Sequence, residues 1–429
     1  MGKEAETMRR RVVVTGMGIW SSIGQDLPTV TESLKQGRSG IVFDHDRIEY
    51  GMRTGLIGNV PLPNLNPLLS HSQRVTMSED TCFAYMAARQ ALEQAQMGDA
   101  YLRANEVGVI FGNDGNSCGS EIAPIMRKEK DSEMVGAYLL YASHTSSPVF
   151  HLSSLFHLRG VSYSVDAACS SSSHAIGIAS VLIRNGIQSA ILVGGSMEVH
   201  SLPFFAEMDV ADMLSRRNEE PEKASRPFDK DRDGMVPSGG AAALVLEEYE
   251  HAVARGATIL AEVCGYGFSS NGIEEISMPS ADAEFIAMKR ALDDAGLQPS
   301  DMDYVNAHGT STPLGDIEEA KALTRLFVKS PMTNDQTATA DWKKSPMISS
   351  TKSMTGHENW MAGASEAVYS ILMMQNNFVA PNINLEHKID EAADLNIVTE
   401  TVYTPINTVL SNSSGMGGTN SALVFRKLD

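Results

Sequence analysis

The chain contains 429 residues, with 34 lysines and arginines against 53 aspartates and glutamates, so its formal net charge is −19. A chain of this length can bury a large hydrophobic core. The deficit of basic residues argues against a nucleic-acid-binding protein and against one that docks on an anionic membrane, because both need clustered lysine and arginine.

No stretch approaches the roughly 18 uncharged apolar residues of a transmembrane helix, and no apolar segment follows the charged residues 1–11. We therefore expect a soluble, cytoplasmic protein. Four cysteines are too few and too scattered for a disulfide framework, and their spacing predicts no metal site. Each cysteine is by default a small buried apolar residue. The four are Cys82, Cys118, Cys169 and Cys264.

Short runs of β-branched residues alternate with longer segments of helical periodicity, which predicts an α/β fold with largely buried strands. Helices are predicted over 78–95 and 283–295, and Gly296 stands where a left-handed C-terminal cap belongs. In chain order, the clearest predicted strands span 12–15, 107–111, 190–193, 243–246, 259–263, 348–351, 409–411 and 422–425.

The two predicted helices resemble each other at residues 89–95 and 289–295, where each contains an Ala-Leu pair and ends on alanine. This match favours an internal duplication whose halves would meet near residues 250–258. Ala-Leu pairs are also common in unrelated amphipathic helices, so the match alone leaves a fold without duplication open. The charged segment 218–232 predicts a surface loop, and the polar segment 328–344 predicts a second, unusually long one.

Cys169 follows a predicted strand that ends near Asp166, and it precedes a helical pattern that begins among small serines. A thiol at a helix N-terminus is expected to have a lowered pKa, because the helix dipole favours the thiolate. The turn could also supply a backbone N–H to an oxyanion. The sequence therefore leaves two interpretations of Cys169 open, a packed core cysteine or a catalytic nucleophile.

Two further loops follow predicted strands and carry reactive side chains. His308 lies after the strand 304–307, and Lys352 and His357 lie after the strand 348–351. The carboxyl ends of the strands are where α/β sheets place reactive groups. Taken singly, each histidine could be structural and the lysine could be solvated, but three such loops together favour a catalytic site.

A glycine-rich turn at residues 412–420 separates two predicted strands. Such a turn can cradle a phosphate, but no helix follows it, so a nucleotide site is not favoured. An oxyanion turn or a mobile gate fits the pattern better.

At these residues the sequence resembles the elongating β-ketoacyl-acyl carrier protein synthases of the thiolase superfamily, closer to type I than to type II. The resemblance covers nearly the whole chain. It is carried by residues 10–18, the turn around Cys169, and residues 221–235, 306–315, 351–357 and 412–420.

The resemblance implies a five-layer α-β-α-β-α fold made of two duplicated βαβαβαββ halves, normally a homodimer. The N-terminal half, residues 10–255, would carry the nucleophile, and the C-terminal half, residues 256–429, would carry both histidines. It also implies no cofactor, since the substrates are carried on the phosphopantetheine of acyl carrier protein.

The resemblance further implies a reaction and its residues. Cys169 would accept the acyl chain as a thioester, and His308 and His357 would support decarboxylation of malonyl-acyl carrier protein. The resulting carbanion equivalent would attack the thioester in a Claisen condensation, extending the chain by two carbons in fatty acid biosynthesis. Covalent catalysis of this kind splits one difficult step into two.

By the same resemblance, Lys352 would be held by Glu319 and would help to order the histidine loops. The backbone N–H groups of Cys169 and Met416 would form the oxyanion hole, with Gly415 and Gly417 in the gate.

Three further residues are assigned to substrate binding by the resemblance. Thr310 and Thr312 would hydrogen-bond the phosphopantetheine arm. Gly115 stands where type II enzymes carry a bulkier pocket residue, so its small size favours type I.

The sequence departs from the family pattern at several positions that bear on substrate choice. Ser414 and Met416 replace the two phenylalanines of the gate, and Asn359 and Trp360 replace a leucine and a glycine. The 328–344 loop also looks longer than usual. These departures predict an altered acyl pocket or gate.

Acyl carrier protein is acidic, so docking on a chain of charge −19 would need a local basic patch. The candidates are Arg74, Arg127, Lys128 and Lys130, although the same charges could simply be solvated.

Three other functions share features with this sequence. A non-condensing partner subunit of the chain-length-factor kind has the same fold but usually lacks the cysteine, whereas Cys169, His308, Lys352 and His357 are all present. A degradative thiolase would use a second cysteine as its base where this chain has His357. A ketosynthase of a secondary polyene or polyketide pathway would use identical chemistry and remains the main alternative.

Overall fold

The computed structural model describes residues 9–328 and 345–428. The predicted 328–344 loop lies outside the described residues except for Val328, which caps the preceding helix. The strands are β1 (Val12–Trp20), β2 (Ile41–Phe43), β3 (Leu56–Gly58), β4 (Gly108–Gly112), β5 (Ser162–Val165), β6 (Ala190–Met197), β7 (Gly240–Glu248), β8 (Ala261–Ser270), β9 (Tyr304–Asn306), β10 (Met347–Ser349), β11 (Phe378–Val379), β12 (Val402–Tyr403), β13 (Thr408–Gly415) and β14 (Thr419–Arg426).

Helices connect most of these strands. They are α1 (Leu27–Gln36), α2 (His45–Glu49), α3 (His71–Arg74), α4 (Glu79–Gln94), α5 (Asp99–Ala104), α6 (Ile122–Glu129), α7 (Leu139–Ala142), α8 (Ser147–Leu155), α9 (Ser171–Arg184), α10 (Leu202–Val210), α11 (Tyr249–Ala254), α12 (Ala281–Ala295), α13 (Gly315–Phe327), α14 (Lys352–Thr355) and α15 (Ala362–Asn376).

The main sheet contains two halves with the same topology. Strands follow the order β1-β7-β6-β4-β5 in one half and β8-β14-β13-β9-β10 in the other. In each half the first strand pairs antiparallel with the last, and the remaining pairs repeat the same antiparallel and parallel pattern. With α4, α8 and α9 in the first half and α12, α13 and α15 in the second, each half follows the predicted βαβαβαββ order.

The duplication extends to single residues. Gly16 in β1 lies so close to α4 that an ideal Cβ would fall 2.1 Å from the carbonyl oxygen of Ala91. Gly265 in β8 lies equally close to α12, where its Cβ would fall 2.2 Å from the carbonyl oxygen of Ala291. Each strand therefore needs glycine for its helix to pack closely, which confirms the duplication that the helix match alone left open.

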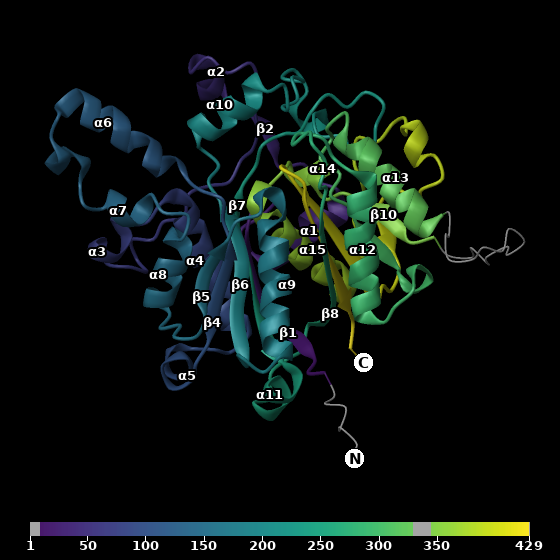
Figure 1. Cartoon of the computed structure of the whole chain (residues 1–429), viewed down its shortest axis with the longest axis horizontal. Coiled ribbons are helices and arrows are strands. Elements are labelled where there is room, and N and C mark those ends of the chain that lie inside the picture. Colours follow the sequence, from purple (N-terminus) through teal and green to yellow (C-terminus); the bar gives the residue numbers. More distant parts are fainter. Residues whose placement is uncertain (1–8, 329–344, 429) are drawn as a thin grey trace, which may run out of the picture.

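The helices divide into outer and central layers (Figure 1). Helices α4 and α8 pack on the first half-sheet and α12 packs on the second, with α13 beside it, while α9 and α15 contact each other and strands of both half-sheets. A short antiparallel pairing of Val13 with Glu262 and of Val14 with Ala261 joins the two half-sheets at β1 and β8. The layers follow the predicted α-β-α-β-α order.

Alternate side chains of β7 pack against helices of two different layers. Ala241, Ala243 and Val245 belong to the apolar cluster beneath α4, whereas Ala242, Leu244 and Leu246 belong to the central cluster around α9 and α15. Successive side chains of a strand point to opposite faces, so a continuous apolar run fits a sheet covered on both sides.

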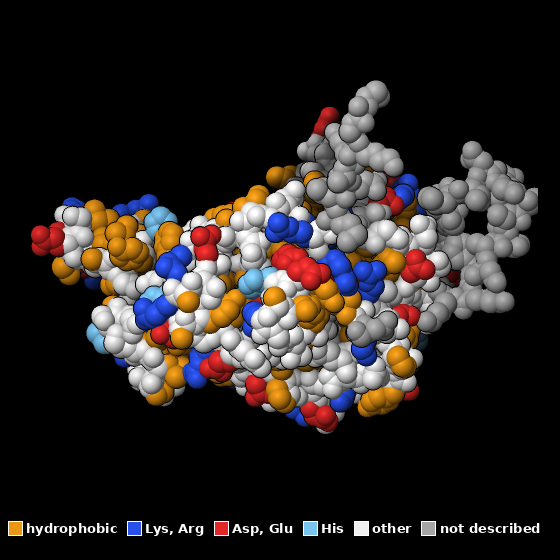
Figure 2. Space-filling view, turned by 90° about the horizontal axis from the view of Figure 1, so that it is seen from below, with side chains coloured by type: hydrophobic (Ala, Val, Ile, Leu, Met, Phe, Trp, Pro, Cys, Tyr) orange, Lys and Arg blue, Asp and Glu red, His pale blue; other side chains and the backbone are white. Residues whose placement is uncertain are grey.

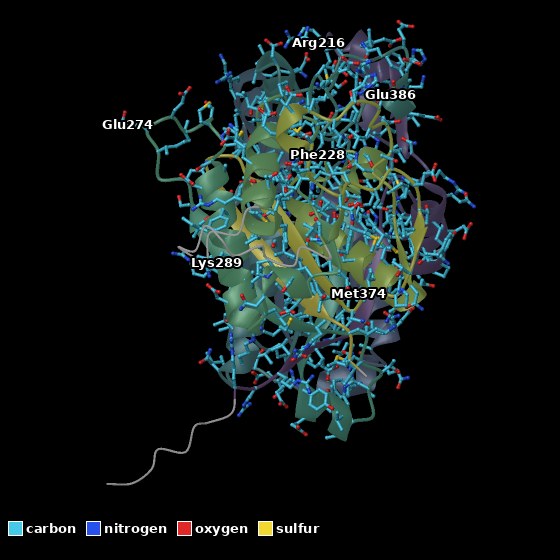
Figure 3. All side chains as sticks on the ribbon, turned by 90° about the vertical axis from the view of Figure 1, so that its right-hand side faces the viewer. Arg216, Phe228, Glu274, Lys289, Met374 and Glu386 are labelled. Carbon is cyan, nitrogen blue, oxygen red and sulfur yellow. The ribbon has the colours of Figure 1, made fainter. Side chains whose placement is uncertain are left out.

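The predicted surface loop at 218–232 is only partly correct. Residues 224–229 are buried, and Phe228 lies inside the molecule while Arg216, just before this segment, lies near its edge (Figure 3). The buried Arg226 guanidinium pairs with Asp229 at 3.0 Å. The charges of Arg226 and Asp229 therefore neutralise each other inside the protein. The prediction of a surface loop assumed that charged residues are exposed to solvent.

Candidate active site

Cys169 lies where the sequence predicts it, between a strand and a helix. Strand β5 ends at Val165, a short 3-10 helix spans Ala168–Ser170, and α9 begins at Ser171. Ala168 has a left-handed φ of 48°, so the chain turns sharply just before the cysteine. Cys169 is half-buried at this turn.

The histidine loops meet because their strands are neighbours. β9 and β10 are adjacent and parallel, so the loops after them emerge at the same edge of the sheet. The rings of His308 and His357 lie edge to face, with centroids 5.3 Å apart and planes at 88°. Both side chains are buried, and the Nδ1 atom of each has no hydrogen-bond partner within the described part of the chain.

Glu319 fixes the His308 loop. Its carboxylate accepts hydrogen bonds from the backbone N–H of His308 at 2.7 Å and of Gly309 at 2.6 Å. It also accepts one from the Asn412 side-chain amide at 2.8 Å, which connects the loop to β13. This buried carboxylate therefore ties the histidine loop to the strand that leads into the glycine-rich turn.

Lys352 pairs with Glu366, not with Glu319. Its ammonium donates a hydrogen bond to the Glu366 carboxylate on α15, and both side chains are buried. The predicted direct pairing of Lys352 with Glu319 is wrong for the described residues. Glu319 accepts hydrogen bonds from two backbone N–H groups and Asn412, and Lys352 acts on it only through its charge. Glu366 was absent from the sequence-based predictions, since nothing in spacing distinguishes it from other helical glutamates.

Burial and the charge of Lys352 keep the histidines neutral. The pKa of His357 falls well below its usual value, first through burial and then through the nearby Lys352 ammonium. Burial, Lys352 and the neighbouring His357 lower the pKa of His308 in the same way. Each ring therefore has one N–H donor and one free nitrogen near neutral pH.

The pKa of the Cys169 thiol is raised, contrary to the prediction from its helix position. Burial raises it to about 11, and a hydrogen bond from the Met416 backbone and the charge of Lys352 oppose the shift. The charge of Asp114 acts in the same direction as burial. Burial raises the pKa more than the helix N-terminus lowers it, because a buried thiolate loses its hydration.

The glycine-rich turn lies over Cys169. It joins β13 to β14 as a hairpin, and the Gly418 N–H donates to the Gly415 carbonyl at 3.0 Å. Gly415 lies against the Ala167 carbonyl, where an ideal Cβ would fall 2.6 Å from its oxygen, and Gly417 has a φ of 79°. The Met416 backbone therefore faces the thiol while its side chain is exposed.

Thr310 and Thr312 lie in the loop between β9 and α13, with their hydroxyl oxygens 3.0 Å apart. Ser311 between them has a φ of 71°, and its backbone N–H donates to the Asp316 carboxylate. The two predicted pantetheine-binding hydroxyls are thus held side by side, next to His308.

A cavity brings Gly115 and Trp360 together. Its lining includes both residues, and the Trp360 ring contacts the Phe204 ring edge to face at 5.0 Å. The neighbouring Asn359 has a left-handed φ of 48° and donates its amide to the His357 carbonyl at 3.2 Å. Of the four substitutions predicted to alter the pocket or gate, only Trp360 lines this cavity, whereas Asn359, Ser414 and Met416 do not.

The predicted docking residues lie on different elements. Arg127 and Lys128 occupy the last turn of α6, and Lys130 follows as its C-cap, whereas Arg74 lies on α3. Lys128 pairs with Glu129 at 3.0 Å. Helix α6 belongs to a segment that projects from the body of the molecule, visible at the left of Figures 1 and 2.

Sequence reasoning also missed a carboxyl pair. Asp114 follows β4 and Asp166 follows β5, and their side chains hydrogen-bond to each other. Burial raises the pKa of Asp114 to about 7, and Asp166 adds to the shift. The signal that located the histidine loops, a polar residue after each of two neighbouring parallel strands, applies here as well.

Two protein-family models together match most of the chain. Residues 9–252 match the family model of the β-ketoacyl synthase N-terminal domain, and residues 260–386 match that of its C-terminal domain. The chain belongs to the β-ketoacyl synthase family. It is therefore a condensing acyltransferase with a thiolase-like fold, as the resemblance implied.

Similar proteins cover the whole chain. The 3-oxoacyl-[acyl-carrier-protein] synthase 1 of Escherichia coli is 40% identical over 98% of this chain and 99% of its own length. A β-ketoacyl synthase structure from Burkholderia phymatum superposes with a TM-score of 0.89 at 34% identity, covering 98% of this chain and 100% of that one. The structure of a type II polyketide ketosynthase bound to its acyl carrier protein superposes with a TM-score of 0.85 at 29% sequence identity, covering 98% of this chain and 100% of that one.

The described residues lack the features of two other classes of protein. Among residues 9–328 and 345–428, no three histidine, cysteine, aspartate or glutamate side chains group so as to hold a metal ion. Over the same ranges, no helix is both long and apolar enough to cross a membrane.

Proposed function

We propose that this β-ketoacyl synthase condenses an acyl thioester on Cys169 with malonyl-acyl carrier protein, extending the chain by two carbons in fatty acid biosynthesis. The observation that supports this most directly is the pair of buried, neutral histidines beside Lys352, whose charge reaches both rings and the Cys169 thiol. The likeness to the Escherichia coli synthase over nearly its full length supports the pathway.

The first step is transfer of the acyl group. The Cys169 thiol loses its proton and the sulfur attacks the thioester carbonyl carbon, while the N–H groups of Cys169 and Met416 stabilise the oxyanion. The carbon–sulfur bond to phosphopantetheine breaks, and the departing thiol takes up a proton. Thr310 and Thr312 would hold the pantetheine arm by their hydroxyls.

The second step forms the new carbon–carbon bond. N–H donors of His308 and His357 stabilise the negative charge that develops on the malonyl thioester oxygen as carbon dioxide leaves. The resulting enolate carbon attacks the Cys169 thioester, and the cysteine sulfur departs and regains a proton. Neutral histidine rings suit this task. Each ring keeps one N–H donor and avoids the cost of burying a positive charge away from water.

Lys352 and Glu319 act as positioning residues in this scheme. Lys352, held by Glu366, places a positive charge near all three reactive side chains. Glu319 holds the backbone of the His308 loop. Neither residue needs to exchange a proton with substrate.

We also propose acyl carrier protein as the partner and a homodimer as the working form. The polyketide ketosynthase that this chain resembles is described in complex with its acyl carrier protein. Charge reversal at Arg127 and Lys128 should raise the KM for carrier-bound substrates but not for small thioesters, and equal effects on both would refute the patch. The predicted cytoplasmic location stays a prediction.

A ketosynthase of a secondary pathway is the second candidate. Likeness to the polyketide complex and the indole of Trp360 in the cavity wall favour it. A non-condensing partner subunit is disfavoured, because such subunits usually lack the cysteine, whereas Cys169 and both histidines are present.

The test is incubation with acyl- and malonyl-acyl carrier protein, followed by intact-protein mass spectrometry. We expect one acyl group on the wild type, none on Cys169→Ala, and one on the matched control Cys82→Ala. A product two carbons longer should follow. Acylation that persists in Cys169→Ala, or an acyl-enzyme that never yields a longer product, would contradict the proposal.

A further inference from the structure

Glu358 lies directly after His357, and the proposed reaction gives it no role. Its side chain is only 1% exposed. Glutamate is rarely buried so completely unless it is paired with a cation. Among the described residues, however, the hydrogen-bond partners of its two carboxyl oxygens are the hydroxyl groups of Ser365 and Tyr369 on α15.

The hydrogen bonds around Ser365 indicate that Glu358 carries a proton. Ser365 Oγ lies 2.5 Å from Glu358 Oε2 and 2.9 Å from the Ala362 carbonyl oxygen. A serine hydroxyl has one proton to donate, so it cannot donate to both oxygens. Both contacts become hydrogen bonds when Glu358 donates to Ser365 and Ser365 donates to Ala362.

The second carboxyl oxygen of Glu358 acts as an acceptor. Oε1 accepts a hydrogen bond from the Tyr369 hydroxyl at 2.9 Å, and Tyr369 is completely buried. A neutral carboxylic acid offers one O–H donor and one carbonyl acceptor, which matches the contacts with Ser365 and Tyr369. An ionised carboxylate is only an acceptor and would leave Ser365 with a single proton between two acceptors.

The charges around Glu358 agree with a neutral acid. Glu358 faces Lys352 from α14 and Glu366 and Tyr369 from α15, and His357 precedes it on its own segment. Burial raises the pKa of Glu358 to about 8. Its two hydrogen bonds and the charge of Lys352 oppose this shift, whereas the Glu366 carboxylate adds to it.

Helix α15 connects Glu358 to the charged pair beside the histidines. Ser365 and Tyr369 hold Glu358, and Glu366 on the same helix pairs with Lys352. Ionisation of Glu358 would add a negative charge beside this pair. In a buried site that charge would oppose the negative charge that develops on the malonyl thioester during decarboxylation.

We propose that Glu358 is a positioning residue that works as a neutral acid, anchoring the segment after His357 to α15 without placing a second negative charge beside Lys352 and Glu366. This inference rests on the proposed function, because it concerns the condensation step. It adds that condensation slows when Glu358 ionises.

The test isolates the second step in the full-length protein. Cys169 is first acylated, malonyl-acyl carrier protein is then added, and the loss of the acyl-enzyme is followed by intact mass between about pH 6 and 9.5. The wild-type rate should fall about tenfold as the pH rises through about 8, because a negative charge is added near the reacting groups. A rate that does not fall in this range would overturn the proposal.

Glu358→Gln is the decisive variant, because glutamine keeps the hydrogen bonds of a neutral acid. Its amide N–H can donate to Ser365, and its carbonyl can accept from Tyr369. It should condense at nearly the wild-type rate at pH 7 and lose the fall near pH 8. Glu358→Ala removes both hydrogen bonds and should be slower at every pH. A glutamine variant that keeps the fall, or that is as slow as the alanine variant at pH 7, would overturn the proposal.

Glu93→Gln is the matched control. Glu93 lies on the outer helix α4, where it is exposed and pairs with Arg89. The substitution removes a carboxylate in the same way but far from the histidines, so the fall near pH 8 should remain. Loss of the fall in this control would show that Glu358 is not its cause.

Urea unfolding provides a readout that needs no substrate. The folded wild type keeps a proton on Glu358 that the unfolded chain loses, so its stability relative to Glu358→Gln should fall as the pH rises from about 5 to 8. A constant difference would overturn the neutral acid. Failure of Cys169 to accept any acyl group would overturn the proposed function as well, whereas condensation with the same pH profile in wild type and Glu358→Gln would overturn only this inference.

Discussion

The reactivity of Cys169 depends on the charges that face it. Burial raises its pKa to about 11, Lys352 lowers it, and Asp114 raises it further. The thiol is therefore mostly protonated at neutral pH, so small changes in nearby charge alter the thiolate fraction. Asp114 has no role in the reaction described above, but its charge should measurably change the pKa of Cys169.

We expect Asp114→Asn to lower the apparent pKa of Cys169, because the substitution removes a negative charge that disfavours the thiolate. Because the pKa of Asp114 is about 7, alkylation by iodoacetamide, followed by mass across a pH series, should become several-fold faster between about pH 7 and the thiol pKa. The two rates should converge at lower pH, where Asp114 is protonated. Asp99→Asn, on the distant α5, is the control and should have no effect. A slower reaction in Asp114→Asn would contradict the sign of this coupling.

The neutral histidines should also make stability depend on pH. The pKa of His357 is lowered in the folded chain, so below about pH 6.5 the unfolded chain binds a proton that the folded chain does not. The free energy of unfolding should then fall with decreasing pH by up to about 1.4 kcal/mol per pH unit for this residue.

Comparison with His357→Gln isolates this contribution from other buried groups. Burial raises the pKa of Glu358 to about 8 and of Glu366 to about 7, and such groups change stability in the opposite direction. In urea unfolding between pH 7 and 5, the free energy of unfolding of the wild type relative to that of the variant should therefore fall as the pH falls. Identical slopes would argue that His357 titrates normally.

At the scale of elements, the chain packs two strand–helix pairs by the same device. Gly16 and Gly265 let β1 and β8 approach α4 and α12 more closely than any side chain would permit. The sequence similarity of the two helices thus reflects a shared packing requirement. Because the two contacts are equivalent, their loss should have equivalent effects.

We expect Gly16→Ala and Gly265→Ala each to reduce the free energy of unfolding by about 1–3 kcal/mol, the usual effect of overpacking. Chemical denaturation measures both. Gly98→Ala is the control, since an added Cβ there meets nothing within 4 Å, and it should change stability little. Tolerance at one position and large loss at the other would contradict the equivalence of the halves.

At the scale of the whole molecule, one end of the sheet remains available for assembly. β5 is the terminal strand in the order of the described sheet. The carbonyls of Val161 and Val165 accept hydrogen bonds from Val109 in β4 and from Asn113 just after it. Because backbone groups alternate in direction along a strand, those of Ser162 and Ser164 point to the open side. An exposed edge of this kind is a template for pairing with a second copy.

We expect light scattering to give about twice the chain mass of 46.3 kDa for the wild type. Ser164→Pro removes one outward N–H without disturbing the β4 pairing and should shift the protein to the monomer. Ser164→Ala keeps the N–H and should remain a dimer. A dimer that withstands Ser164→Pro would place the interface elsewhere.

Prediction from the sequence succeeded for features that depend on neighbouring residues, such as strand ends and helix caps. The loops of His308 and Lys352 meet because β9 and β10 are neighbouring parallel strands. Cys169, in contrast, follows β5 at the other end of the sheet order, and its turn contacts β13 and β14 only through the tertiary structure. Strand lengths were underestimated, as in β1 and β7, because glycine and alanine within them weaken the β-branched signal. The Gly296 cap was correct, with a left-handed φ of 68°.

By itself, the sequence determined the α/β class and the family, and it predicted which strand ends carry Cys169, His308 and Lys352, since these depend on residue type and order along the chain. Only the tertiary structure decided that Lys352 pairs with Glu366, that burial raises the Cys169 pKa, and that Asp114 joins Trp360 in one cavity. These are interactions between segments far apart in sequence, and their strength depends on how much water the fold removes.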